Sequence, residues 1–262
     1  MNFLHSFQPK AIAFSVGSLD VHWYGLFLVI GITIGFIIVL YFANKKQVDK
    51  DHFYNLFFYF IVFGTIGGRL AHVFGEWSYY TEHLSETYKI WLGGLSLHGV
   101  FLACLVVIII YTKIKKLSFW LIADIVAIGI PLAQFIGRLG NYFNQEIFGK
   151  QTNLAWGIPI DLEKRPYGLL DQEYYHPLFL YESILDLIIF IFLILLSRTK
   201  FIRQGEILLI YAVCYSAIRF CLDFLRIEVV SAGPLSLIQW VSLLIIIVSI
   251  IILIFRRKKA TA

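Results

Sequence analysis

The stretch of sequence that decides the fold is FWLIADIVAIGIPLAQFIGRLGNYFNQEIFG, residues 119–149. Its first part, Phe119–Ile136, is apolar and long enough to cross a bilayer as a helix. An arginine, two asparagines and a glutamate follow directly after it. Because polar and ionisable side chains are costly inside a membrane, they normally mark a functional site. The stretch therefore predicts a membrane helix with a polar site at one end.

The composition extends this prediction to the whole chain of 262 residues. Hydrophobic residues make up 59% of it and charged residues 15%, and the mean hydropathy is +0.78. A soluble domain of this length would leave far too much apolar surface in water. We therefore expect an all-α integral membrane protein that forms a single transmembrane domain over residues 1–262. About seven spans are predicted, at Trp23–Ala43, Phe53–Phe74, Leu97–Thr112, Phe119–Ile136, Leu178–Leu196, Ile207–Leu225 and Leu235–Phe255.

The short loops predict the orientation of these spans. Basic residues gather on one side, at Lys45, Lys46, Lys50, Lys113, Lys115, Lys116, Arg198, Lys200, Arg203 and Arg256–Lys259. The short segments on the opposite side hold only Lys10, Lys89 and Arg226. Since basic loops stay in the cytoplasm, the N-terminus is expected outside and the C-terminus in the cytoplasm. The pI near 9.0 then reflects this topology and contact with anionic membrane lipids, with no sign of nucleic-acid binding.

With this orientation, the long loop over residues 137–177 is extracytoplasmic. Proline and glycine punctuate it in the patterns of turns, as at Gly157-Ile158-Pro159. Its aromatic residues favour an ordered cap at the lipid interface, and they are Trp156, Tyr167, Tyr174 and Tyr175.

Several polar side chains are expected to meet at the outer membrane level. Each stands at the outer end of a predicted span, and together they are Tyr24, Arg69, His98, Arg138 and Asn141. On the sixth span a single helical face is formed by Tyr215, Arg219, Asp223 and Arg226, at offsets of four, four and three. This convergence predicts one polar site in the outer half of the membrane.

The charges of this site allow two interpretations. Arg69 and Asp223 are equally well explained as ion-pair partners inside the bundle. Arg138 and Arg219 belong to a group of arginines that exceeds the nearby acids, which are Glu146, Glu182 and Asp223. Because a guanidinium forms bidentate bonds with phosphate oxygens, the surplus of positive charge favours a phosphate headgroup as ligand. His98 lies among glycines, and is either a helix-start residue or a proton acceptor at neutral pH.

Residues 137–141 (GRLGN), followed by Asn144 and Glu146, resemble the signature of the bacterial prolipoprotein diacylglyceryl transferases. Further motifs follow in the family's order, at residues 22–25 (HWYG), 67–70 (GGRL), 94–99 (GLSLHG), 176–182 (HPLFLYE) and 215–220 (YSAIRF). Two positions depart from the pattern, since Asp223 stands where many members have glutamate and Gln145 where some have glycine. The resemblance covers nearly the whole chain.

The resemblance implies an activity and its partners. The diacylglyceryl group of phosphatidylglycerol would pass to the lipobox cysteine of a prolipoprotein signal peptide, giving a thioether and releasing glycerol phosphate. This would occur in the bacterial cytoplasmic (inner) membrane, with the active site of the multi-pass enzyme toward the extracytoplasmic side. No metal or cofactor is expected, because displacement at an sp³ carbon needs no activated water and the chain lacks a glycine-rich nucleotide fingerprint.

The reaction suggests a role for each candidate residue. Arg138 and Arg219 would hold the departing phosphate, and His98 would accept the thiol proton. Alternatively Glu146 is the base, or the thiolate forms by electrostatic stabilisation alone. The remaining candidates would bind substrate, and they are Tyr24, Asn141, Asn144, Arg69, Tyr215 and Asp223.

Two other classes of protein compete with this interpretation. An anion or lipid transporter would also need an arginine-lined pathway, but such proteins often show inverted repeats around a site near the bilayer midplane, and no such repeat is visible. A lipid-binding scaffold without catalysis predicts that His98 and Glu146 can be changed with no loss of function.

Overall fold

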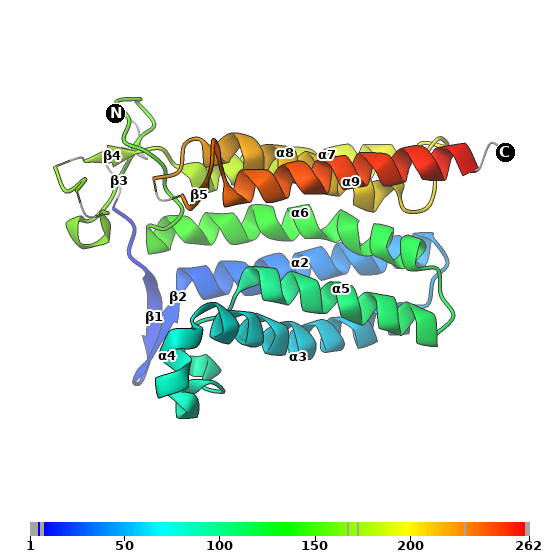
Figure 1. Ribbon diagram of the computed structural model, residues 1–262, viewed down its shortest axis with the longest axis horizontal. Helices are drawn as coiled ribbons and strands as arrows, with labels where there is room; N and C mark the ends of the chain where they lie inside the picture. The colour runs from blue at the N-terminus through cyan, green and yellow to red at the C-terminus, as the bar shows by residue number, and fades with distance from the viewer. Residues whose placement is uncertain (1–4, 6–7, 167, 172, 228, 260–262) are drawn as a thin grey trace. The chain divides into compact units, whose positions relative to one another are not determined.

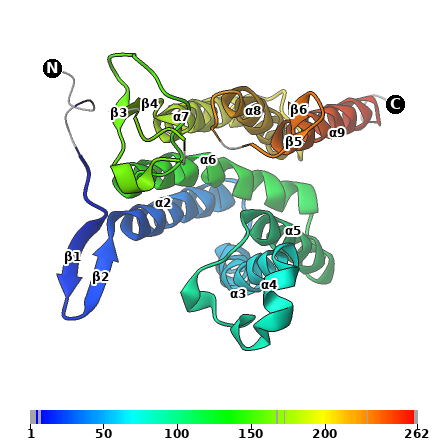
Figure 2. The same cartoon turned by 60° about the vertical axis from the view of Figure 1, so that its left-hand side comes forward.

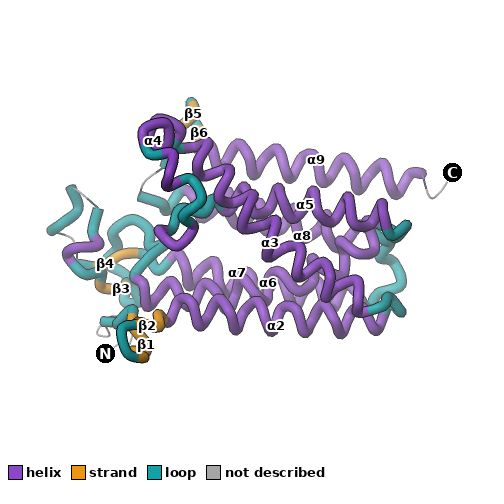
Figure 3. Tube along the Cα trace, turned by 90° about the horizontal axis from the view of Figure 1, so that it is seen from below, coloured by secondary structure: helices purple, strands orange, loops and turns teal. Residues whose placement is uncertain are grey.

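The computed structural model describes residues 1–262 except for 1–4, 6–7, 167, 172, 228 and 260–262. Helices dominate the described residues (Figures 1 and 3). The long ones are α2 (Trp23–Lys45), α3 (Lys50–Gly75), α5 (Leu97–Ile114), α6 (Phe119–Asn144), α7 (Leu178–Ser197), α8 (Glu206–Asp223) and α9 (Leu237–Lys259). Short helical turns are α4 (Trp77–Glu82), η1 (Leu84–Glu86), η2 (Ile90–Leu92) and η3 (Leu162–Lys164). The chain divides into two compact units, residues 1–38 with 126–262, and residues 39–125.

Six helices among the described residues are long and apolar enough to span a membrane: α2, α3, α5, α6, α7 and α9. Their exposed faces carry large apolar side chains, such as Leu102, Ile188 and Val248, which suit lipid rather than water. The chain is thus a helical integral membrane protein. Helix α8 also has 18 residues, but it carries three charged residues, Glu206, Arg219 and Asp223. The predicted seventh span and the predicted orientation stay predictions.

Helix α6 is longer than the sequence predicted. The expected span ended at Ile136 and the expected loop began at residue 137, whereas the helix continues to Asn144. The predicted start of the loop was therefore wrong, and Arg138, Asn141 and Asn144 are helical. The helix continues through its glycines because α2 packs against this part of it. A Cβ added at Gly140 would lie 3.0 Å from the Tyr24 Cα.

Helices α2 and α6 lie side by side (Figure 2), and their contact depends on small residues along its length. A Cβ added at Gly31 would lie 2.7 Å from the Ala133 carbonyl oxygen, and one added at Gly35 would lie 2.9 Å from the Gly129 carbonyl oxygen. In lipid, helices associate mainly through such close backbone packing, since the hydrophobic effect does not drive them together. This packing fixes the end of α6 beside the start of α2.

A small folded segment follows α6. Strand β3 (Ile158–Pro159) pairs antiparallel with β4 (Tyr174–Tyr175). Ile158, Ile160 and Tyr175 form a buried core with Phe179 from α7, each at most 2% exposed. The described part of the segment thus folds around apolar side chains. The ordered cap at the lipid interface stays a prediction, and Tyr167, one of its predicted aromatic residues, lies outside the described residues.

Two further hairpins were not predicted from the sequence. Strands β1 (Ile12–Val16) and β2 (Leu19–His22) pair antiparallel directly before α2, with Gly17 at φ +63° in the turn, where glycine is favoured. Strands β5 (Ser231–Ala232) and β6 (Leu235–Ser236) pair directly before α9. Both hairpins are too short to produce a recognisable alternation of apolar and polar residues.

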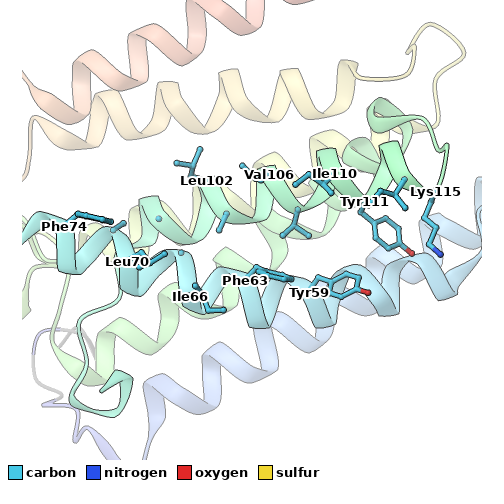
Figure 4. A pocket seen from close by; sticks show the side chains of 16 residues that line it. Tyr59, Phe63, Ile66, Leu70, Phe74, Leu102, Val106, Ile110, Tyr111 and Lys115 are labelled. Carbon is cyan, nitrogen blue, oxygen red and sulfur yellow. The ribbon is translucent and has the colours of Figure 1, made fainter. Parts of the chain in front are cut away.

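In the second unit, α3 packs against α5, and Gly67 and Gly99 lie at their closest approach. Along the same pair runs a groove of about 890 Å³, whose walls carry Ile66 and Leu70 from α3 and Leu102 from α5 (Figure 4). Tyr59, Tyr111 and Lys115 lie at one end of the groove and Phe74 at the other. Its apolar walls match the lipid environment that the hydropathy of both helices indicates.

We expect Gly140→Ala to destabilise the protein and Gly137→Ala to leave it unchanged or slightly more stable. The added methyl at residue 140 meets the Tyr24 Cα and the Phe27 Cβ at 3.0 and 3.1 Å, whereas nothing lies within 4 Å of the corresponding position at residue 137. Overpacking of this kind costs about 1–3 kcal/mol. Thermal unfolding of both purified variants in the same detergent measures the difference, and equal melting temperatures would contradict the packing described for α6.

Candidate active site

Glu182 is the centre of a cluster of polar side chains from three helices. Its carboxylate, only 1% exposed, accepts a hydrogen bond from Arg138 Nη2 at 2.7 Å and from Arg219 Nη1 at 3.0 Å. The Tyr215 hydroxyl donates to the same carboxylate at 3.2 Å. These four residues, Arg138, Glu182, Tyr215 and Arg219, are called the arginine cluster below.

The four side chains of the arginine cluster come from α6, α7 and α8. Arg138 stands in the last two turns of α6, and Glu182 is the fifth residue of α7. Tyr215 and Arg219 are four residues apart on α8, so they share one face of that helix. The structure brings together the predicted residues Arg138, Tyr215 and Arg219. It adds Glu182 as their shared acceptor, a role that the sequence analysis missed although its motif at residues 176–182 pointed to this position.

With respect to the described residues, the arginine cluster keeps N–H donors available for a ligand. Each guanidinium has five N–H donors, and Glu182 accepts one from each arginine. The side chains of Arg138 and Arg219 are 18% and 15% exposed, so they are largely, but not completely, buried. A partly buried pair of guanidinium groups around one carboxylate has the chemistry to bind phosphate oxygens.

Asp186 lies one turn after Glu182 on α7 and was not predicted as a site residue. Its side chain is 0% exposed, and it interacts electrostatically with Glu182, Arg138 and Arg219. Neither of its carboxylate oxygens accepts a hydrogen bond from any residue that the structure describes. Its interactions place Asp186 beside the arginine cluster. A buried carboxyl group without hydrogen-bond donors is unusual in a native protein.

A second polar group follows directly after α6. The exposed Glu146 carboxylate accepts hydrogen bonds from Asn141 Nδ2 at 3.4 Å and from Asn144 Nδ2 at 3.3 Å. The residues on either side of it, Gln145 and Ile147, both have φ +53°. This left-handed conformation is unfavourable for most residues and most of all for a β-branched one such as isoleucine.

Contacts from the folded segment hold this strained backbone. Gln145 Nε2 donates to the Asp161 carboxylate at 2.7 Å, and the Asp161 amide donates back to Gln145 Oε1 at 2.7 Å. The Ile147 carbonyl accepts from the Phe179 amide at 3.0 Å. Strain that the surrounding structure maintains is typical of functional sites. No role for Gln145 was predicted from the sequence, because only the fold shows that it fixes the position of Glu146.

Two further predicted residues of this unit have structural partners. Tyr24, the second residue of α2, is half-buried and packs against Gly140. Asp223 is 4% exposed and accepts a hydrogen bond from the Ser236 hydroxyl. The Ser236 hydroxyl also accepts from the Gln239 amide in the first turn of α9. Asp223 therefore supports the turn into α9 and, among the described residues, forms no ion pair with Arg219.

The candidates Arg69 and His98 belong to the unit formed by residues 39–125. The Arg69 guanidinium donates to backbone carbonyls at 2.5–3.1 Å, those of Glu86, Thr87, Gly93 and Gly94. Gly93 and Gly94 have φ +87° and +75°, which glycine adopts readily. Arg69 thus fixes the loop that leads into α5, where His98 is the second residue and has an exposed side chain.

No group of three or more histidine, cysteine, aspartate or glutamate residues in the described part of the chain has an arrangement that could hold a metal ion. The candidate site is thus built from arginine, carboxylate, amide and hydroxyl groups. These groups bind anions and orient hydrogen-bonding ligands.

Fold and site together define a class: a helical integral membrane protein with a buried arginine cluster suited to a phosphate-bearing ligand. Residues 11–255 match the family described as prolipoprotein diacylglyceryl transferase. The chain therefore belongs to this family and is an enzyme.

Similar proteins from several bacteria carry the same name, phosphatidylglycerol–prolipoprotein diacylglyceryl transferase. The protein from Thermosynechococcus vestitus is 37% identical over 242 residues, covering 92% of this chain and 90% of that protein. The protein from Listeria monocytogenes serotype 4a is 38% identical over 257 residues, covering 96% and 92%. The protein from Nostoc sp. is 36% identical over 241 residues, covering 90% and 85%. The relatives thus match this chain over nearly its whole length.

We expect Glu182→Gln to lower the transfer rate at least 100-fold. The amide keeps the shape of the side chain but removes the charge that both arginines share, so neither guanidinium stays in position. Glu163→Gln is the matched control, because Glu163 lies exposed on η3, and it should keep the rate within about twofold. If folded Glu182→Gln protein transfers at more than half of the wild-type rate, the role of Glu182 in the candidate site is contradicted.

Proposed function

We propose that this chain transfers the diacylglyceryl group of phosphatidylglycerol to the lipobox cysteine of a prolipoprotein. The observation that carries the proposal is the arginine cluster, in which two guanidinium groups share one carboxylate. The names of the relatives indicate the same two substrates. A transporter is not favoured, because the family and these relatives are named as transferases.

The reaction asks for charge stabilisation at the phosphate. The cysteine sulfur forms a C–S bond with the terminal carbon of the diacylglyceryl group, and the C–O bond from that carbon to the phosphate breaks. The electron pair of this bond leaves with the phosphate oxygen, so negative charge grows on the departing glycerol phosphate. Arg138 and Arg219 stabilise this charge through the donors that Glu182 leaves unused. A preorganised donor of this kind contributes roughly 10²–10³ in rate.

The thiol proton must also find an acceptor. His98 is our proposed base, because its exposed position after a glycine-rich turn suits a group that meets a substrate. Glu146 is the alternative, because Asn141 and Asn144 hold its carboxylate. Tyr24, Asn141 and Asn144 orient the headgroup, whereas Arg69 acts through the loop that it holds before His98.

We further propose that both units form one catalytic domain in the bacterial inner membrane. Helix α8 is then the seventh span, with the N-terminus outside and the C-terminus in the cytoplasm, as the basic loops indicate. In this orientation the arginine cluster and the folded segment after α6 face the extracytoplasmic side. Phosphatidylglycerol, the lipobox of the signal peptide and the anionic lipids of the membrane are the expected partners.

Rescue of a bacterial strain depleted of its own transferase tests the function. We expect the wild-type chain to restore growth and Arg138→Ala to fail, although both are present in the membrane at equal amounts. Arg198→Ala is the matched control, because Arg198 is exposed at the end of α7, and it should rescue. Failure of the wild-type chain would contradict the function, and rescue by Arg138→Ala would contradict the role of the arginine cluster.

The pH dependence of transfer tests the base. His98→Gln removes the proposed base and keeps a polar side chain of similar size. We expect it to lower the rate by about 10²–10⁴ and to move the remaining activity to higher pH, where more of the substrate thiol is ionised. The same profile for Glu146→Gln tests the alternative. A near-normal rate and an unchanged profile in His98→Gln would exclude the histidine.

A further inference from the structure

A second basic site lies beside the folded segment that follows α6. It is a pocket of about 360 Å³ where three loops meet, lined by Ile147, Phe148, Lys164, Pro166, Arg226 and Ile227. Among the lining residues that the structure describes, two are cationic and none is acidic. Of these six residues only Arg226 was predicted as part of the polar site, and the pocket is too small to hold acyl chains.

Lys164 and Arg226 have N–H donors that no described residue accepts. Lys164 Nζ donates one hydrogen bond, to the Asn144 carbonyl at 2.8 Å, and an ammonium group has three N–H donors. The half-buried Arg226 side chain donates no hydrogen bond to any residue that the structure describes. The pKa of Arg226 lies below its ordinary value because burial removes water from the guanidinium and Arg219 repels its charge, which Glu182 and Asp223 offset only in part. An anion in the pocket would compensate both effects.

The walls of the pocket are held in place by the contacts of the candidate site. Ile147 has φ +53°, and its carbonyl is bonded to the Phe179 amide. The Lys150 amide donates to the Leu225 carbonyl at 2.8 Å, and the Arg226 amide to the Asp223 carbonyl at 3.1 Å. Gly149 allows this approach, because an added Cβ there would lie 2.6 Å from the Leu225 oxygen. The pocket is therefore a built feature of the fold.

We propose that this pocket binds a phosphate monoester dianion and is the release site of the glycerol phosphate product. The inference rests on the proposed function. The intact lipid carries one negative charge on its phosphodiester, whereas a phosphate monoester carries close to two at neutral pH. Two cations with free donors match the product better than the substrate. Arg226 interacts electrostatically with Arg219, so the pocket adjoins the arginine cluster. Lys164 donates to the carbonyl of Asn144, and the Asn144 side chain donates to Glu146, so the pocket also adjoins Glu146.

Direct binding of radiolabelled glycerol phosphate to the purified full-length chain tests the proposal without relying on activity. We expect Arg226→Gln and Lys164→Gln each to weaken binding about tenfold or more, since each removes a charge-assisted hydrogen bond. Arg226→Lys should keep most of the affinity, which separates loss of charge from loss of folding. Lys150→Gln is the control, because it changes an exposed lysine of the same loop that does not line the pocket. Unchanged binding by the folded double variant K164Q/R226Q would overturn the proposal.

Two further measurements define the ligand. The same variants should need about tenfold more glycerol phosphate to inhibit transfer, while the KM for phosphatidylglycerol in nanodiscs stays within twofold of wild type. A KM that rises as much as the inhibition constant would mean that the pocket holds the intact lipid, which contradicts the proposal. Inorganic phosphate should bind more weakly than glycerol phosphate, and equal affinity would also contradict it. If the wild-type chain binds glycerol phosphate in an Arg226-dependent way but does not transfer the diacylglyceryl group, only the proposed function is contradicted.

Discussion

The structure of the site depends on one interaction, the sharing of the Glu182 carboxylate between Arg138 and Arg219. A guanidinium group inside a membrane protein needs a counterion, because an unpaired buried charge is costly. One carboxylate between two arginines meets that need and still leaves donors unused. It also ties α6, α7 and α8 together at the level where the chemistry is proposed. The same contact therefore serves the fold and the binding of phosphate.

Much of the fold follows from the sequence because membrane helices need long apolar segments. The observed starts of α2, α5 and α7 coincide with the predicted ones. The predicted end of α6 was wrong by eight residues. Glycine and polar residues suggest a loop after Ile136, whereas tertiary packing against Tyr24 stabilises the helix as far as Asn144. The short hairpins escaped prediction for a similar reason, since a few residues carry no periodic signal.

The residues of the candidate site could be predicted from the sequence better than their hydrogen-bond partners could. Arg138, Tyr215 and Arg219 were expected together from their places in the spans, and the structure groups them around Glu182. The partners of Arg69 are backbone carbonyls, which no residue pattern reveals. The left-handed conformation of Gln145 and Ile147 is equally invisible in the sequence, because neither residue type favours it. Tertiary contacts decide both features.

If the arginine cluster stabilises a phosphate leaving group while a thioether forms, the two products must appear together. Transfer is best followed with the purified chain, phosphatidylglycerol labelled in its acyl chains and headgroup, and a synthetic lipobox peptide. We expect diacylglyceryl-modified peptide and glycerol phosphate in a one-to-one ratio, and neither product from a Cys→Ser lipobox peptide. Release of glycerol phosphate without modified peptide, or modified peptide that retains the phosphate, would contradict the proposed reaction.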